Sequence, residues 1–194
     1  MPGRMQRVKV TMVASNVLYQ APIFISICRG LDPAIFDCEF VLLNPGHARF
    51  EDTLREFGMP TTRINLYGNR SMPIAFIRLV WHFLRRRPDV VHAHLLHAGL
   101  LGMVAAWVTR VKRRLYTHHH ANFQPTYFPK RAWIDRMINR FATTIVVATD
   151  IVKNVVIKHE GADPAKVELI HFGFSNTEWQ SVDAARVEAI RTRY

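Results

Sequence analysis

The chain has 194 residues, a net charge of +11 and a hydrophobic fraction of 49%. This length suits one substantial domain, and a charged fraction of 21% is typical of a globular chain rather than a disordered one. The longest apolar run, residues 98–108, is shorter than the roughly 20 residues that a membrane-spanning helix needs. Cys28 and Cys38 fit no zinc or CxxC spacing, so we expect reduced thiols in a cytoplasmic protein.

Short apolar runs rich in β-branched residues alternate with helical patterns along the chain. The runs predict seven strands, at residues 8–13, 38–43, 62–66, 90–93, 115–117, 144–147 and 167–170. Apolar periodicity predicts helices over residues 73–87, 97–110, 131–142 and 150–159. Strands that alternate with helices favour a parallel sheet covered on both faces. We therefore expect an α/β fold with a Rossmann-like, doubly wound sheet of about seven strands.

The helix predicted over residues 73–87 has a broad apolar side. Its members are Ile74, Ile77, Leu79, Val80, Trp81 and Leu84. Arg78 and residues 85–87 lie on the other side of this helix or at its C-terminal end, where cations favour the helix dipole.

The positive charge is concentrated in the middle of the chain, where residues 63–140 carry 14 basic and 2 acidic side chains. Such a block suits phosphate groups, acidic lipid head groups or nucleic acid, and a basic surface with no particular partner is the alternative. We expect salt-sensitive binding to anionic membranes, because basic residues near such a surface favour it. The cations expected to take part are Arg85, Arg86, Arg87, Lys112, Arg113 and Arg114. No nucleic-acid partner is expected, because no recognisable binding motif is present.

Ligands of doubly wound sheets bind beyond the carboxyl ends of the strands. The loop after the first predicted strand, which begins with Ser15 and Asn16, has no GxGxxG and no P-loop pattern. A dinucleotide or P-loop site is therefore not expected there.

Histidine is the distinctive residue, and six of the ten histidines surround two predicted strand ends. They are His92, His94 and His97 near one strand and residues 118–120 after the next. Residues i and i+2 share a face of a strand, so His92 and His94 are expected to point together. Such imidazoles could donate hydrogen bonds to hydroxyl or phosphate oxygens, and a purely structural role is the alternative. A metal site is not expected, because no Cys, Asp or Glu completes a ligand pattern.

The segment RPDVVHAH, residues 87–94, is followed by an apolar helix and then by LYTHH, residues 115–119. This order resembles the N-terminal domain of family-4 glycosyltransferases of the GT-B fold, which has a Pro-Asp-Val-Val-His-x-His strand and then a strand ending in Thr-x-His. Residues 144–149 and 166–174 resemble the last strands and the glycine turn of that domain. The chain departs from the family in lacking a Gly-Gly pair in the first loop and the usual Asn-Gly-Val-Asp in the last turn.

The resemblance implies that residues 1–180 form the N-terminal domain and that residues 181–194 begin a linker helix toward a donor-binding domain absent from this chain. It implies a retaining transfer of a hexose from a nucleotide sugar to an acceptor hydroxyl of a glycan or glycolipid. This half would bind the acceptor, with no metal or other cofactor, and would be inactive alone. We expect it in the cytoplasm or peripherally on the inner face of the membrane. The alternative is a non-catalytic acceptor- or membrane-docking subunit of a split glycosyltransferase.

By the same resemblance, His119 takes the place of the histidine that reaches the reacting sugar and the acceptor. His120 is its rival, because a shift of one residue exchanges the two faces of a strand. The residues expected to contact acceptor or substrate lie at the same edge of the sheet: Asn16, His94, His118, His120, Thr149 and Gly173.

Overall fold

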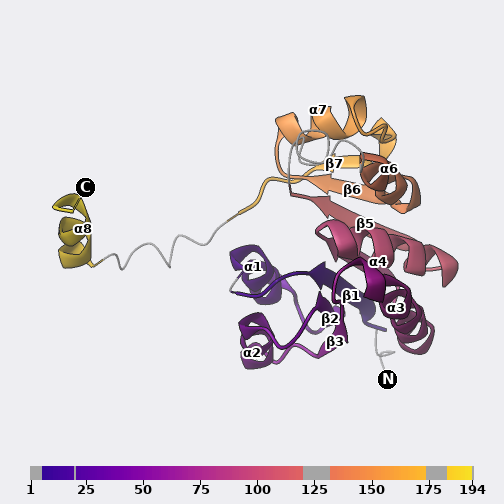
Figure 1. Cartoon of the computed structure of the whole chain (residues 1–194), viewed down its shortest axis with the longest axis horizontal. Coiled ribbons are helices and arrows are strands. Elements are labelled where there is room, and N and C mark those ends of the chain that lie inside the picture. The colour runs from indigo at the N-terminus through magenta and orange to yellow at the C-terminus, as the bar shows by residue number, and fades with distance from the viewer. Residues whose placement is uncertain (1–5, 20, 120–131, 174–182, 194) are drawn as a thin grey trace, which may run out of the picture.

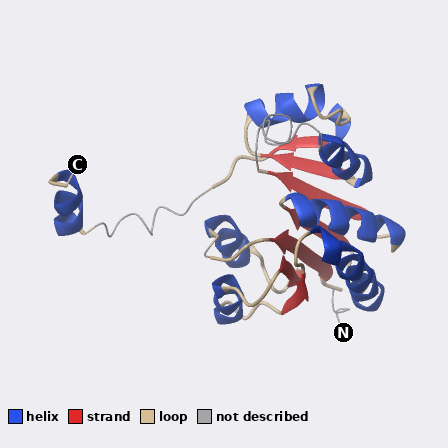
Figure 2. Cartoon of the chain, in the orientation of Figure 1, coloured by secondary structure: helices blue, strands red, loops and turns tan. Residues whose placement is uncertain are grey.

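A computed structural model describes residues 6–19, 21–119, 132–173 and 183–193. Its centre is a seven-stranded parallel sheet with helices on both faces (Figure 1, Figure 2). The strands are β1 (Val8–Ser15), β2 (Phe36–Asn44), β3 (Thr61–Asn65), β4 (Val90–His94), β5 (Arg113–His118), β6 (Thr144–Val147) and β7 (Val167–Leu169). Their order is β3-β2-β1-β4-β5-β6-β7, which confirms the predicted doubly wound sheet.

The helices are α1 (Pro22–Gly30), α2 (Arg49–Glu56), α3 (Met72–Arg86), α4 (Leu96–Val108), α6 (Ala132–Phe141), α7 (Asp150–Lys158) and α8 (Ala184–Arg191). Short 3-10 turns lie at Asn69–Ser71 and Pro164–Lys166. The four predicted helices are confirmed as α3, α4, α6 and α7. The sequence reasoning missed α1 and α2, which have only 9 and 8 residues and therefore offer little periodicity to detect. Within the described ranges no helix combines the length and hydrophobicity that crossing a bilayer requires.

Two separate apolar cores hold the helices against the sheet. On one face, Phe24 of α1 and Phe50 of α2 pack on Phe40 of β2, with ring centroids 5.6–6.3 Å apart. On the other face, α3, α4, α6 and α7 bury residues such as Phe83 and Ile138. The chain therefore leaves β1 toward one face and β4 toward the other, although these two strands are neighbours. In doubly wound sheets, a divergence of this kind marks the crevice at which ligands bind.

The helix α4 lies unusually close to the sheet beside that crevice. A Cβ atom on Gly99 would lie 2.6 Å from Cε2 of Tyr116, so only glycine fits at this point. The Oγ atom of Ser15 accepts a hydrogen bond from the backbone N–H of Ala98 (3.2 Å), which links the end of β1 to the first turn of α4. The helix α4 is buried over most of its length.

The apolar side predicted for residues 73–87 is only partly buried in the structure. The buried residues of α3 are Ala75, Leu79 and Phe83. Four of the six predicted apolar residues are instead exposed: Ile74, Ile77, Trp81 and Leu84. A helix that covers a sheet buries only one stripe of its surface, and this helix has more apolar residues than that stripe can hold.

Two of the six cations expected at a membrane are engaged inside the domain. The Nη2 atom of Arg86 lies 2.8 Å from Oδ1 of Asp37, and its Nε lies 3.2 Å from Oε1 of Glu39. The Nε atom of Arg114 donates to the carbonyl oxygen of Phe141 (2.7 Å). These contacts fasten α3 and α6 to the sheet. The other four cations are exposed: Arg85, Arg87, Lys112 and Arg113.

Candidate functional site

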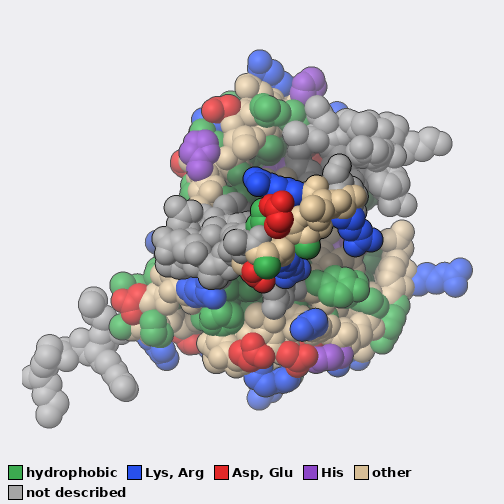
Figure 3. Space-filling model, turned by 90° about the vertical axis from the view of Figure 1, so that its left-hand side faces the viewer, with side chains coloured by type: hydrophobic (Ala, Val, Ile, Leu, Met, Phe, Trp, Pro, Cys, Tyr) green, Lys and Arg blue, Asp and Glu red, His purple; other side chains and the backbone are tan. Residues whose placement is uncertain are grey.

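The carboxyl ends of β1, β4 and β5 meet at the same edge of the sheet, because the strands are parallel and adjacent. Ala14 pairs with His94 across β1 and β4, and His94 pairs with Thr117 across β4 and β5. Figure 3 looks onto this side of the molecule.

Three imidazoles form a connected cluster at this edge. The rings of His92 and His94 have centroids 4.2 Å apart, which confirms that they point together. The Nε2 atom of His92 lies 2.7 Å from Oγ1 of Thr117, and Nδ1 of His94 lies 3.1 Å from Nε2 of His119. The ring of Phe172 lies on the far side of His119, at 5.7 Å. The cluster thus runs from the interior of the sheet toward the solvent.

His94 is the buried member of this cluster, with only 1% of its surface exposed. The edge of its ring meets the ring of Phe24 in α1 at 4.8 Å. Its Nε2 atom is buried with no hydrogen-bond partner among the described residues. His94 was expected to contact substrate directly, but here it lies behind His119, which is only partly buried.

Burial also determines the charge of the cluster. It lowers the pKa of His92 to about 4, and the neighbouring His119 contributes in the same direction. The pKa of His94 is held well below its usual value by burial and by His92 and His119. Both rings are therefore neutral near pH 7, and each carries one N–H and one acceptor nitrogen.

His118, although next to His119 in sequence, faces the opposite side of β5. Its Nε2 atom lies 3.0 Å from Oε2 of Glu160, and both side chains are buried. Asp135 of α6 completes the group, and Nδ2 of Asn139 donates to Oε2 of Glu160 (3.4 Å). Burial and the nearby Glu160 raise the pKa of Asp135 to about 6, although His118 opposes this shift.

The side-chain donors of His118, Asp135 and Glu160 lie within 4.8 Å of one another, and such a set has the chemistry to hold a divalent cation. The ion pair between His118 and Glu160 already gives both side chains a partner. The sequence analysis found no acidic residue to complete a histidine ligand set, because Asp135 and Glu160 are distant from His118 in the chain. The structure separates His118 from the other predicted site residues.

The loop after β1 is held by residues that the sequence analysis did not single out. Asn16 is exposed and has a φ of 57°, the left-handed region that asparagine tolerates better than most residues. The side chain of Asn44, from β2, accepts from the backbone N–H of Val17 (3.2 Å) and donates to its carbonyl oxygen (3.0 Å). Asn16 thus adopts without glycine a conformation that favours glycine.

The remaining predicted site residues lie apart from the imidazole cluster or outside the described ranges. The Oγ1 atom of Thr149 accepts from the backbone N–H of Val152 (3.3 Å) and so caps α7. Gly173 is exposed, with open space where a Cβ would lie. His120 falls outside the described residues. Phe172, which lies within the segment 166–174 that resembles the glycine turn, contacts His119.

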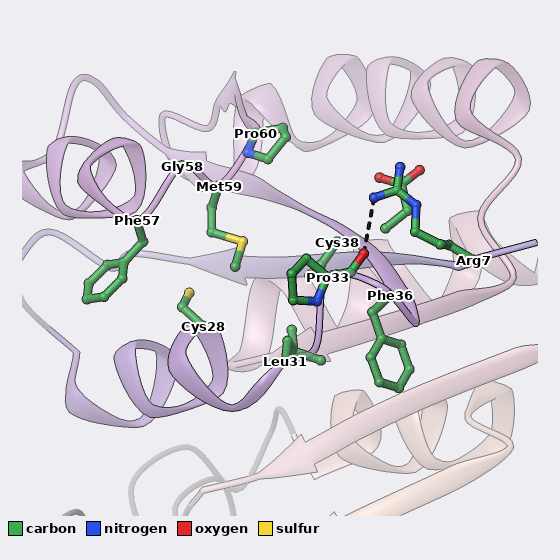
Figure 4. Close-up of a pocket in the computed structure, with 11 residues that line it drawn as sticks. Arg7, Cys28, Leu31, Pro33, Phe36, Cys38, Phe57, Gly58, Met59 and Pro60 are labelled. Atoms are coloured by element: carbon green, nitrogen blue, oxygen red, sulfur yellow. Dashed lines mark hydrogen bonds between the residues drawn. The ribbon is translucent and has the colours of Figure 1, made fainter.

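A separate cavity of about 360 Å³ lies near the amino ends of β1 and β2 (Figure 4). Arg7, Phe36 and Met59 are among its lining residues, and Nη1 of Arg7 donates to the carbonyl oxygen of Pro33 (3.2 Å). Cys28 and Cys38 also line it, and burial raises the pKa of these free thiols to about 11 and about 12. They are therefore protonated near pH 7 and poor nucleophiles.

Comparison with known proteins identifies the class of this domain. Residues 23–176 match the sequence model of Glycosyltransferase Family 4. A curated relative from Escherichia coli, UDP-Gal:alpha-D-GlcNAc-diphosphoundecaprenol alpha-1,3-galactosyltransferase, is 27% identical over 130 residues. This match covers 63% of the chain and 33% of the relative.

Solved structures share the fold at low sequence identity. The Anabaena protein HepE, crystallised with UDP-glucose, superposes with a TM-score of 0.74 at 13% identity, over 96% of this chain and 50% of HepE. The UDP-GlcNAc 2-epimerase of Methanocaldococcus jannaschii gives a TM-score of 0.64 at 14% identity, over 84% of this chain and 45% of the epimerase. The chain thus spans half or less of the length of these proteins.

Proposed function

The chain belongs to glycosyltransferase family 4, and we propose that it is the acceptor-binding half of a retaining glycosyltransferase. The enzyme would move a hexose from a nucleotide sugar to an acceptor hydroxyl. The acceptor oxygen bonds to the anomeric carbon, the bond from that carbon to the diphosphate breaks, and the hydroxyl proton passes to the departing diphosphate. The observation that carries this proposal is His119, held by the buried His94 at the carboxyl edge of the sheet.

The substrate class is proposed from the relatives. The name of the Escherichia coli enzyme specifies a UDP-linked galactose donor and a sugar on diphosphoundecaprenol as acceptor. HepE was crystallised with UDP-glucose. We therefore favour a UDP-hexose donor and a lipid-linked sugar acceptor, which is the glycolipid branch of the sequence expectation.

The imidazole pair suggests how His119 acts. His94 is neutral, so its Nδ1 either donates to or accepts from Nε2 of His119. When His94 donates, the N–H of His119 is on Nδ1, the ring nitrogen that His94 does not contact. That N–H could hydrogen-bond a sugar hydroxyl or a phosphate oxygen of the bound substrate. In this proposal His119 is the catalytic residue and His94 is a positioning residue that sets its tautomer.

The other predicted contacts remain part of the proposal to different degrees. Asn16 and Gly173 are exposed, and they are the best placed to contact substrate directly. Thr149 would act through its cap on α7. His118 would act only indirectly, because it is buried beside Glu160 on the other side of β5. His120 would act from the segment that follows His119.

We also propose a division of labour between two domains. Residues 1–180 would bind the acceptor, and residues 181–194 would begin the linker to a domain that binds the nucleotide sugar. The chain spans only a third of its curated relative and half of HepE, which supports this arrangement. A domain of this kind would transfer no sugar alone.

A cytoplasmic enzyme with a lipid-linked acceptor has to work at a membrane surface. We propose a peripheral location on the inner face of an anionic membrane. Of the cations that the sequence analysis named, Arg85, Arg87, Lys112 and Arg113 are exposed and free to contribute.

The test compares the chain alone with the chain joined to a family-4 donor-binding domain. Both are incubated with UDP-hexoses and a polyprenyl-diphosphate sugar, and the anomeric configuration of the product is read by NMR. We expect transfer only with the donor-binding domain present, and a product with the anomeric configuration of the donor. Turnover by the chain alone would contradict the division of labour, and an inverted product would contradict retention.

A further inference from the structure

We infer that the outer side of the α3–α4 helix layer is a docking surface that inserts into an anionic bilayer. This surface consists of Ile74, Ile77, Trp81 and Leu84 of α3 with Trp107 and Val108 of α4. The inference rests on the proposed membrane location and names the part of the molecule that would make the contact.

The apolar stripe on α3 is exposed without any role in the domain core. Its four residues recur at spacings of three, four and three, so they share one side of the helix. Between 58% and 65% of each side chain is exposed. The buried side of α3 is formed by other residues, so folding does not account for the stripe. Apolar residues grouped in this way on a surface mark a site of interaction.

The exposed residues of α4 extend this stripe across the layer. Both helices cover the same face of the sheet and pack against each other. A hollow of about 300 Å³ lies between the C-terminal ends of the two helices. Leu84 and Arg87 line it on the α3 side, and Thr109 and Arg110 line it on the α4 side. Trp107 is 54% exposed and packs its ring 5.1 Å from that of Phe141.

The charge around the stripe is mostly positive, with the exposed Asp89 just beyond the end of α3 as an acidic neighbour. Exposed cations lie along α3 and just beyond the ends of both helices: Arg78, Arg85, Arg87, Arg110, Lys112 and Arg113. The guanidinium of Arg85 lies 5.3 Å from the ring centre of Trp81. Within α3, α4 and the described side chains of α6, the one acidic residue is Asp135, which is buried.

A bilayer fits this combination better than other partners do. Tryptophan favours the interface between head groups and acyl chains, aliphatic side chains favour the acyl region, and arginine and lysine favour anionic head groups. A nucleic acid would use the cations but would leave Ile74, Ile77 and Leu84 without a partner.

The position of the surface is compatible with the proposed reaction. The chain leaves the carboxyl edge after β3 and returns to the amino edge at β4, so α3 runs the length of the sheet between them. A bilayer against α3 would leave the carboxyl edge uncovered. A lipid-linked acceptor in the same bilayer could then approach His119 from the end of α3 that carries Ile74.

The experiment measures sedimentation of the purified chain with vesicles of phosphatidylcholine, with or without phosphatidylserine. We expect binding only with phosphatidylserine and release by about 0.5 M NaCl, because salt screens surface charge. The double variant Ile77→Ser/Trp81→Ser should bind at least about tenfold more weakly, and so should Arg78→Ser/Arg85→Ser. All four positions are exposed, so the variants should keep their fold.

Matched control variants replace exposed apolar residues and exposed cations outside the proposed docking surface. Ile35→Ser/Ile151→Ser removes two apolar side chains that are 51% and 70% exposed, and Arg49→Ser/Arg55→Ser removes two exposed cations from α2. Both controls should bind like the natural chain. The inference is overturned if the natural chain binds neither vesicle, binds both equally, or loses as much affinity in the controls.

A second readout locates the contact. Brominated acyl chains should quench Trp81 and Trp107, so Trp81→Phe/Trp107→Phe should lose most of the quenching. Tight binding to a DNA duplex that is unchanged by Ile77→Ser/Trp81→Ser, without vesicle binding, would replace the bilayer by nucleic acid. None of these measurements needs sugar transfer, so failure here overturns the docking surface and leaves the proposed reaction to its own test.

Discussion

His118 and His119 are consecutive residues, yet the structure gives them opposite surroundings. His119 lies at the carboxyl edge beside His94, among neutral rings. His118 lies on the other side of β5, buried against Glu160 and Asp135. Side chains alternate across a strand, so a difference of one position exchanges the crevice for the interior. Residue type alone therefore does not determine what a histidine does here.

The two clusters also differ in the ionisable groups that they contain. The edge cluster consists of imidazoles, and burial keeps the rings of His92 and His94 uncharged. The interior cluster contains two carboxyl groups around one imidazole, so a buried contact between His118 and Glu160 is part of the fold. We expect substitutions in the first to affect chemistry and substitutions in the second to affect stability.

The largest expected effect is on stability, at His118. The His118→Ala variant leaves the buried carboxyl groups of Glu160 and Asp135 without their imidazole partner. Removal of one partner from a buried salt bridge typically costs about 3–5 kcal/mol. Urea unfolding of the isolated chain near pH 7 measures this loss. The matched variant His119→Ala should lose less than about 1 kcal/mol. Equal losses at the two positions would remove the distinction between the clusters.

The next effect is on catalysis, at His119. In the complete two-domain enzyme, His119→Ala should lower the turnover number about 100-fold or more, because it removes a preorganised donor at the reacting centre. The melting temperature should stay nearly unchanged. A fully active His119→Ala enzyme would contradict the assignment. Loss of activity in His120→Ala instead would move the role one residue along the chain.

A smaller effect tests the carboxylates of the interior cluster. The pKa of Asp135 is raised from 3.8 to about 6 in the folded chain, so the folded state binds more protons than the unfolded state between these values. This contribution to stability is present at low pH and is lost as the pH rises through about 6. Asp135→Asn removes the titration, so its stability relative to the natural chain should rise by about 1–3 kcal/mol from pH 4 to about pH 7. Urea unfolding across this range measures the change, and a constant difference would show that Asp135 titrates normally.

An effect of similar size and opposite sign lies in the edge cluster. The pKa of His92 is lowered from 6.5 to about 4, so the unfolded state binds more protons between these values and stability is lost as the pH falls. His92→Gln cannot titrate and should lose about 2–3 kcal/mol less than the natural chain on acidification from about pH 7 to pH 4. The same unfolding series measures it. A variant as acid-sensitive as the natural chain would show that His92 is accessible to protons in the fold.

Much of the architecture was predictable because it depends on local patterns. Apolar runs bounded by turns indicated all seven strands, and periodicity indicated α3, α4, α6 and α7. The short helices α1 and α2 were missed because one or two turns give too little periodicity. The exposure of the apolar stripe on α3 was also not predicted. The sequence pattern of an apolar helix face is the same whether that face packs on a sheet or contacts a bilayer.

The sequence predicted the arrangement of the candidate site only where the spacing of residues along one strand determines which face they share. The two-residue interval between His92 and His94 places both rings on one face of β4 wherever that strand lies. The sequence by itself therefore determined the alternating elements, the family and the edge of the sheet at which the histidines gather. Tertiary structure decided that His119 meets His94 while His118 meets Asp135 and Glu160, residues that reach β5 only through the packing of α6 and the turn after α7. The physical reason is that burial and ion pairing depend on contacts between distant segments, which no local pattern records.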